Sequence, residues 1–245
     1  MSAMTDSEPV LATEGVSHAF GSVEVLDDVS VAVDPGTVTA LIGPNGSGKT
    51  TLLRILAGVL SPVSGTVTYR GPQRDREIGY MPQQPSFRPG FSTHETLAFY
   101  TSFVGGEPAE LLDRVGLGDA ADRNVEALSG GMRRLLGIAQ ATVGDPPVVV
   151  LDEPGSGLDP GMRQRTFEVV RELADDGAAV LLSTHDLLNA EQYADQVVLL
   201  ETGTVIASDT PGQLFEEYDC RSLQELFDVA ISGEAGTVEV AGGSQ

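Results

Sequence analysis

The chain has 245 residues, of which 14 are Lys or Arg and 36 are Asp or Glu, giving a formal net charge of −22. Because a sequence-independent nucleic-acid binder needs a basic face for phosphate contacts, this charge argues against that class. A hydrophobic share of 41% excludes a wholly disordered acidic chain.

Short apolar runs alternate with helical patterns along the chain, which is typical of an α/β fold with a mainly parallel sheet. Continuous apolar runs favour strands buried on both faces, and they lie at 38–42, 148–151, 179–183 and 197–200. Strands are also predicted at 65–70 and 77–81. Apolar residues at helical spacing predict three helices. The first covers 50–60, the second begins at a capping box formed by Ser92 and Glu95, and the third runs from residue 162 and stops at Gly177.

These elements predict one domain over residues 1–245. An α/β core with a β-rich edge is expected over 10–84 and 144–210, a small helical subdomain over 85–143, and a C-terminal extension over 211–245. No apolar run approaches the roughly 20 residues of a membrane-spanning helix. The first ten residues lack the features of a signal peptide, and the single cysteine, Cys220, fits a reducing compartment. We therefore expect a soluble intracellular protein.

A phosphate-binding loop follows the first apolar run. Residues 43–50 match G-x-x-x-x-G-K-[ST] in full, between a predicted strand and a predicted helix. The glycines allow backbone N–H groups to surround phosphate oxygens at a helix N-terminus, while Lys49 is expected to reach the β- and γ-phosphates and Thr50 to bind Mg²⁺. An ordinary glycine-rich turn is the alternative, but Lys49 is the only lysine of the chain. The predicted ATP contacts in this segment are Gly43, Pro44, Asn45, Gly46, Ser47, Gly48, Lys49, Thr50 and Thr51.

Two acidic residues follow the apolar run at 148–151. Because ligands of open α/β sheets bind at the carboxyl ends of the strands, Asp152 is expected to hold Mg²⁺ and Glu153 to act on the attacking water as a general base. Adjacent acids after a strand are also common on protein surfaces. The phosphate loop in the same chain favours the catalytic interpretation.

Between these two sites lies the segment Leu128-Ser129-Gly130-Gly131-Met132. With it the chain resembles the nucleotide-binding subunits of the ATP-binding cassette (ABC) transporter family, from about residue 10 to residue 226. The resemblance implies a P-loop NTPase fold, and it places Ser129, Gly130 and Gly131 against the γ-phosphate of an ATP held by an opposite subunit. A plain serine N-cap explains Ser129, but not two glycines that cost helix propensity directly after it.

Four further residues match motifs of this family, and each has a plainer alternative. Phe20 matches the aromatic that stacks on adenine, although it also suits a core or hairpin position. Gln83 matches the glutamine that contacts Mg²⁺ and the attacking water, with Gln84 directly beside it. Asp159 matches the aspartate loop at the dimer interface and is equally a good helix N-cap. His185 matches the switch histidine that bonds the γ-phosphate, whereas lone histidines are more often structural.

The resemblance implies an ATPase that uses Mg²⁺ and pairs around two ATP molecules, as a homodimer or with another ABC subunit. Such a subunit drives transport through separate integral membrane subunits from the cytoplasmic face of the membrane, without inserting into it and without binding nucleic acid. Met132 and the segment 222–227 resemble the export-type (ABC-2-like) branch. The alternatives are a soluble ABC protein of DNA repair or translation, and a regulatory module that holds ATP without hydrolysing it.

The predicted motifs use few of the 36 acidic residues. Because ATP is itself an anion, the net charge opposes its approach unless salt screens it, and at molar salt the Debye length falls to roughly 3 Å. Many acids with a single lysine resemble the composition of proteins from halophilic archaea that accumulate salt. We therefore expect a protein that works at high salt.

Overall fold

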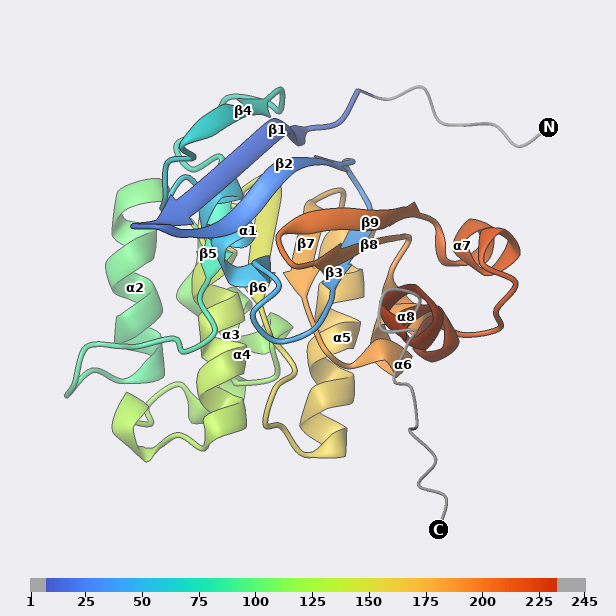
Figure 1. The fold of residues 1–245 in the computed structure, drawn as a ribbon. Helices are drawn as coiled ribbons and strands as arrows, with labels where there is room; N and C mark the ends of the chain where they lie inside the picture. The colour runs from blue at the N-terminus through green and yellow to red at the C-terminus, as the bar shows by residue number, and fades with distance from the viewer. Residues whose placement is uncertain (1–7, 233–245) are drawn as a thin grey trace, which may run out of the picture.

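A six-stranded sheet lies at the centre of the computed structural model, which describes residues 8–232 (Figure 1). Its strand order is β5-β6-β7-β3-β8-β9, and all neighbours are parallel except β8 and β9. The four continuous apolar runs all lie in this sheet, which confirms the predicted α/β class. The strands are β3 (Val38–Ile42), β5 (Ile78–Met81), β6 (Val148–Asp152), β7 (Ala179–Ser183), β8 (Gln196–Glu201) and β9 (Thr204–Asp209).

The central sheet is apolar throughout because its two faces belong to two hydrophobic cores. In β6, Val149 and Leu151 pack into one core, whereas Val148 and Val150 pack into the other, following the alternation of side chains along a strand. Helices α4 (Gly130–Ala141) and α5 (Pro160–Asp175) contribute to the first core, and α1 (Lys49–Leu56) to the second.

A three-stranded antiparallel sheet of order β2-β1-β4 forms the predicted β-rich edge and lies over α1 (Figure 1). Strand β4 (Ser64–Tyr69) corresponds to the predicted strand at 65–70, whereas β1 (Leu11–Phe20), β2 (Val23–Val33) and β9 have no counterpart among the predicted strands. Helix α1 is shorter than the predicted 50–60, because Gly58 takes a left-handed φ of 69° just past its end.

Helices make up the segment that the sequence assigns to a helical subdomain. Ser92 accepts a hydrogen bond from the Glu95 backbone N–H and donates its own N–H to the Glu95 carboxylate, so the predicted capping box is present. No strand occurs within residues 85–143, all of which the structure describes, apart from a single bridge between Ser92 and Asn124. The helices are α2 (Thr93–Val104), α3 (Pro108–Arg114) and α4, with 3-10 turns at Gly118–Ala120 and Val125–Ala127.

The helical segment meets the central sheet through a backbone contact at the end of α4. Gly79 of β5 lies so close to the carbonyl group of Ala141 that a Cβ atom on Gly79 would overlap it. Nearby, the Arg76 guanidinium donates to the carbonyls of Gln140 at 2.8 Å and Val143 at 3.3 Å. These contacts fasten the helical segment to the strand that leads to Gln83.

The remaining helices contribute to the same core as α4 and α5. Helix α5 ends before Gly177, as predicted, and α8 (Leu223–Ser232) buries Leu223 and Leu226 completely. Residues 233–245 of the predicted C-terminal extension lie outside the described residues, as do residues 1–7. Within 8–232, none of the helices combines the length and hydropathy that crossing a membrane requires. These helices are α6 (Leu187–Tyr193), α7 (Pro211–Glu217) and α8 (Leu223–Ser232).

Candidate active site

The loop after β3 forms one wall of an open cleft at the carboxyl edge of the central sheet. A Cβ atom on Gly43 would overlap the Leu200 carbonyl, and one on Gly48 would lie 2.7 Å from the Val25 carbonyl oxygen, so the loop can follow this path only with glycine at both positions. The cleft has a volume of about 410 Å³. Its lining residues are Val25, Asn45, Gly46, Gly48, Lys49, Thr50, Thr51, Gln83, Asp152 and Glu153.

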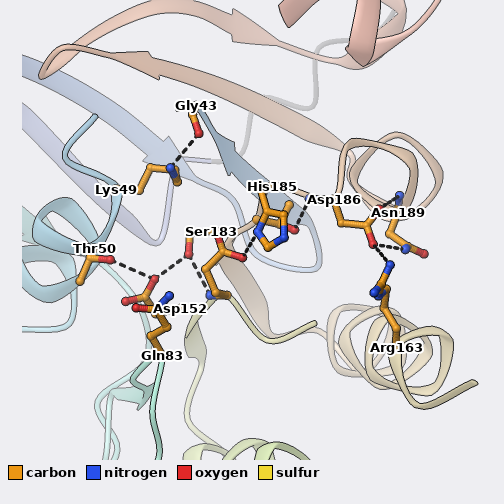
Figure 2. A network of polar contacts seen from close by, with 12 residues as sticks. Gly43, Lys49, Thr50, Gln83, Asp152, Arg163, Ser183, His185, Asp186 and Asn189 are labelled. Carbon is orange, nitrogen blue, oxygen red and sulfur yellow. Dashed lines mark hydrogen bonds and ion pairs between the residues drawn. The ribbon is translucent and has the colours of Figure 1, made fainter. Parts of the chain in front are cut away.

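Lys49, the only lysine of the chain, is buried at the start of α1. Its Nζ donates to the carbonyl oxygens of Gly43 at 2.8 Å and Pro44 at 2.9 Å, which holds the ammonium group against the loop (Figure 2). Burial lowers the pKa of this ammonium group, and the nearby carboxylates of Glu153 and Asp152 oppose that shift. Lys49 therefore places a partly desolvated positive charge close to the two acids of the cleft.

Asp152, the last residue of β6, is buried in a network of hydroxyl groups (Figure 2). Its Oδ1 accepts hydrogen bonds from Ser183 Oγ at 2.7 Å and from Thr50 Oγ1 at 3.3 Å. Its Oδ2 is buried and has no hydrogen-bond partner among the described residues. A carboxylate oxygen left free beside a threonine hydroxyl suits Mg²⁺, which binds oxygen ligands and commonly takes one or two carboxylates together with substrate phosphates. Residues 8–232 contain no cluster of three or more His, Cys, Asp or Glu that could hold a metal ion by themselves.

Glu153 follows Asp152 with a left-handed backbone, at φ 52°. Its N–H donates to Ser183 Oγ at 2.9 Å, so Ser183 at the end of the neighbouring β7 holds both acidic residues. The Glu153 carboxylate lies 2.7 Å from His185 Nδ1. The Glu153 side chain is only 10% exposed, whereas that of His185 is 62% exposed, so the pair presents its imidazole to solvent.

Beside His185, a second group of polar contacts joins Asp186 to Arg163 and Asn189 (Figure 2). Asp186, next to His185, accepts from the Arg163 guanidinium at 3.3 Å, and the same guanidinium donates to the Leu158 carbonyl at 3.1 Å. Asp159 is exposed and accepts from the Met162 N–H at 3.0 Å, as the N-cap of α5. Arg163 therefore connects the histidine segment to the segment that precedes α5.

The remaining predicted site residues do not line the cleft, and neither do Gly43, Pro44, Ser47, Asp159 and His185. Ser129 and Gly130 are exposed at the start of α4, where Ser129 Oγ accepts from the Met132 N–H at 3.2 Å as an N-cap. Gly131 is half-buried beside Met162. Phe20 is 52% exposed at the end of β1, and its ring packs edge-to-face with that of His18, with 4.7 Å between the two ring centroids.

Arg134 belongs to the site but was not among the predicted residues. Its Nη1 donates to the carbonyl oxygens of Gln83 at 2.9 Å and Glu153 at 2.8 Å. Burial lowers the pKa of this guanidinium, and Glu153 and Asp152 oppose that shift. The only sequence signal is a pair of arginines directly after the LSGGM segment of an acid-rich chain.

A sequence profile of the ABC transporter family matches residues 26–156, which include the phosphate loop, the LSGGM segment and both acids of the site. The chain belongs to this family. Nod factor export ATP-binding protein I of Cupriavidus metallidurans is 35% identical to this ABC ATPase, covering 89% of this chain and 77% of that protein. The daunorubicin/doxorubicin resistance ATP-binding protein DrrA of Streptomyces peucetius is 37% identical, covering 94% of this chain and 74% of that protein.

A solved structure of the ATP-binding subunit of an ABC transporter is similar to this ABC ATPase in fold, with a TM-score of 0.81 at 30% identity. The match covers 91% of this chain and 99% of that one. ABC ATP-binding domains are ATPases, and the relatives are transporter subunits. The family therefore supports the transporter subunit rather than the soluble repair or translation protein.

Proposed function

We propose that this ABC ATPase binds ATP and Mg²⁺ in the cleft at the phosphate loop and hydrolyses ATP with Glu153 and His185. The observation that carries the proposal is the network joining Thr50, Asp152, Ser183, Glu153 and His185, which gathers phosphate-binding and proton-handling groups at one edge of the sheet. The loop residues Gly43 to Thr51 surround the phosphates. Phe20, exposed at the end of β1, is the candidate for stacking on adenine.

Asp152 Oδ2, Thr50 Oγ1 and the Gln83 side chain are the groups of this chain that would hold Mg²⁺. When bound, the ion neutralises part of the charge on the β- and γ-phosphates. Lys49 adds a compact positive charge at the same phosphates. Because phosphoryl transfer depends on positioning and charge stabilisation, these fixed groups are suited to it.

Glu153 is placed to accept a proton from the attacking water. With a proton on Nδ1, His185 donates to the Glu153 carboxylate and fixes its orientation across the 2.7 Å contact. The other ring nitrogen of the exposed imidazole is then free to face the γ-phosphate. The pair thus orients the base and contacts the phosphate with a single histidine.

The second half of each ATP site comes from another subunit, either a second copy of this chain or a paired ABC subunit. Ser129 and Gly130 are exposed at the N-terminus of α4, where free backbone N–H groups and the helix dipole favour an anion. Gly131 follows them on the same helix, and Asp159 is exposed before α5. These residues have no role in the cleft of their own chain, which supports their use across an interface.

The dimer is proposed to drive export through separate membrane subunits that contact the helical subdomain over 85–143 from the cytoplasmic side. Support comes from Met132, from the segment 222–227 and from the relatives named for Nod factor export and for daunorubicin and doxorubicin resistance. The core over 10–84 and 144–210 then supplies the ATP site. The C-terminal extension, described as far as residue 232, packs on the core through α8.

The proposal is tested with Glu153→Gln. We expect hydrolysis to fall about 100-fold or more, since a general base is lost, while ATP binding persists and the protein elutes as a dimer with ATP in size-exclusion chromatography. Glu107→Gln, which changes an exposed glutamate at the start of α3 with no capping hydrogen bond, is the matched control. An E153Q protein that stays monomeric with bound ATP, at low and at molar salt, contradicts the shared site.

We also infer that the protein works at high salt, as in halophilic archaea. At a net charge of −22, the acidic groups of the folded chain repel one another, and the chain as a whole repels the anion ATP. Screening then stabilises the folded chain, so the melting temperature is expected to rise from low salt to molar KCl. A flat or falling curve contradicts this inference and leaves the ATPase proposal intact.

A further inference from the structure

Arg134 joins two loops that lie far apart in the sequence. It stands on α4, five residues after Ser129, and its Nη1 donates to the carbonyl of Gln83 at 2.9 Å and to that of Glu153 at 2.8 Å. Within residues 8–232 the Arg134 side chain forms no ion pair with a carboxylate. Its hydrogen bonds therefore go to main-chain carbonyls and not to acidic side chains.

The contact with Glu153 matters because that residue has a strained backbone. A non-glycine residue at φ 52° costs conformational free energy and persists only where its surroundings hold it. Here the N–H of Glu153 donates to Ser183 Oγ at 2.9 Å, and its C=O accepts from Arg134. Ser183 thus holds the N–H of Glu153 and Arg134 holds its C=O. Together they fix the backbone conformation that directs the Glu153 side chain to His185.

We propose that Arg134 is a positioning residue, which ties the orientation of Glu153 and of the Gln83 loop to the position of α4. Ser129 caps the N-terminus of α4. Contact of another subunit with that end of the helix would therefore be passed to the base through α4 and the Arg134 guanidinium. The proposal rests on the proposed role of Glu153 as the base. It assigns Arg134 no contact with ATP.

Arg133, the preceding residue, offers a matched control on the same helix. Its guanidinium also donates to two main-chain carbonyls, those of Val125 at 3.3 Å and Glu126 at 2.9 Å, but these lie outside the cleft. If Arg134 only fastened α4 to the fold, removing either guanidinium would have the same consequences.

The experiment compares Arg134→Met, Arg134→Lys and Arg133→Met in the full chain by steady-state ATP hydrolysis, ATP-dependent thermal shift and melting temperature. For Arg134→Met we expect kcat to fall about 10- to 100-fold with KM for ATP changed by no more than about threefold, since a displaced base slows chemistry and not binding. Arg134→Lys, which can still donate to a carbonyl, is expected to recover part of kcat. Arg133→Met is expected to keep kcat.

A double-mutant cycle with Glu153→Gln separates positioning from other roles. If Arg134 acts through Glu153, Arg134→Met causes no further loss in the E153Q protein. The inference is overturned if Arg134→Met keeps kcat, if Arg133→Met lowers kcat equally, or if the two losses multiply. Should Arg134→Met fail to fold, Arg134→Lys decides instead: a lowered kcat with KM for ATP changed by no more than about threefold supports the inference, and an unchanged kcat overturns it. An E153Q protein that hydrolyses ATP normally refutes the proposed function instead.

Discussion

At the carboxyl edge of the sheet, Asp152 and Glu153 are held by side chains from other elements, whereas Ser129 and Asp159 bond only the helices that they begin. The first region is mostly buried and connected; the second is exposed. A group that is fixed by its own fold is ready to act within the chain, and an exposed cap is free to meet another molecule. A site shared between two subunits requires both kinds of region, because one subunit supplies the fixed groups and the other supplies the exposed ones.

The largest expected effect is on the connected region. Lys49→Ala removes the one ammonium group of the cleft, so ATP affinity is expected to fall by about 3 kcal/mol or more, roughly 100-fold. Nucleotide-dependent thermal shift measures this loss. Arg54→Ala, which removes an exposed positive charge from the same helix, is the control and should leave ATP binding unchanged. Equal losses in both variants would mean that general charge, not Lys49, governs binding.

The exposed region is tested with Gly130→Ala. A Cβ atom at Gly130 meets nothing within 4 Å, so stability is expected to stay the same or to rise by up to about 1 kcal/mol. ATP binding should also persist, while hydrolysis falls by at least about tenfold because the methyl group blocks approach of a phosphate to the helix end.

Gly212→Ala is the matched control for this variant, since Gly212 lies near the start of α7 with equally open space around its Cβ position. It should change stability in the same way and leave hydrolysis intact. If Gly130→Ala remains fully active, the exposed segment does not face a phosphate, and the contrast between the two regions loses its functional meaning.

The smallest effect is expected at the cap of α5. Asp159→Ala should cost about 1 kcal/mol of stability, or about 2–4 °C in melting temperature for a chain of this size. Thr210→Ala removes the equivalent cap of α7, where Thr210 Oγ1 accepts from the Gln213 N–H at 3.3 Å. Both variants should melt earlier, but only Asp159→Ala should weaken the ATP-dependent dimer measured by size-exclusion chromatography.

The parallel core could be predicted from the sequence because its signals are local. Strands β3 and β7 have the predicted bounds, since continuous apolar runs with turn residues at both ends have one plausible structure. The antiparallel strands β1 and β2 were missed because register shifts interrupt their pairing, as at Val16 and His18, so the alternation that marks a half-buried strand is broken.

The site was predictable where a residue type is tied to a motif, as at Lys49 and Asp152. Arg134 was not, because its role depends on two carbonyl groups that come from residues 83 and 153. Because every residue type carries a main-chain carbonyl, the sequence gives no sign of which carbonyls a side chain will bond. Only the packing of α4 on the sheet brings these groups within hydrogen-bond distance.

The close approach of Gly79 to Ala141 has a consequence for genetics. Gly79 carries no side chain and lies outside the cleft, yet any larger residue there would force α4 away from β5. A screen for lost transport would therefore return Gly79 together with Lys49, for unrelated reasons. Measuring the abundance of each variant alongside its phenotype would separate them, because a Gly79 variant should be depleted from the cell while a Lys49 variant should accumulate normally.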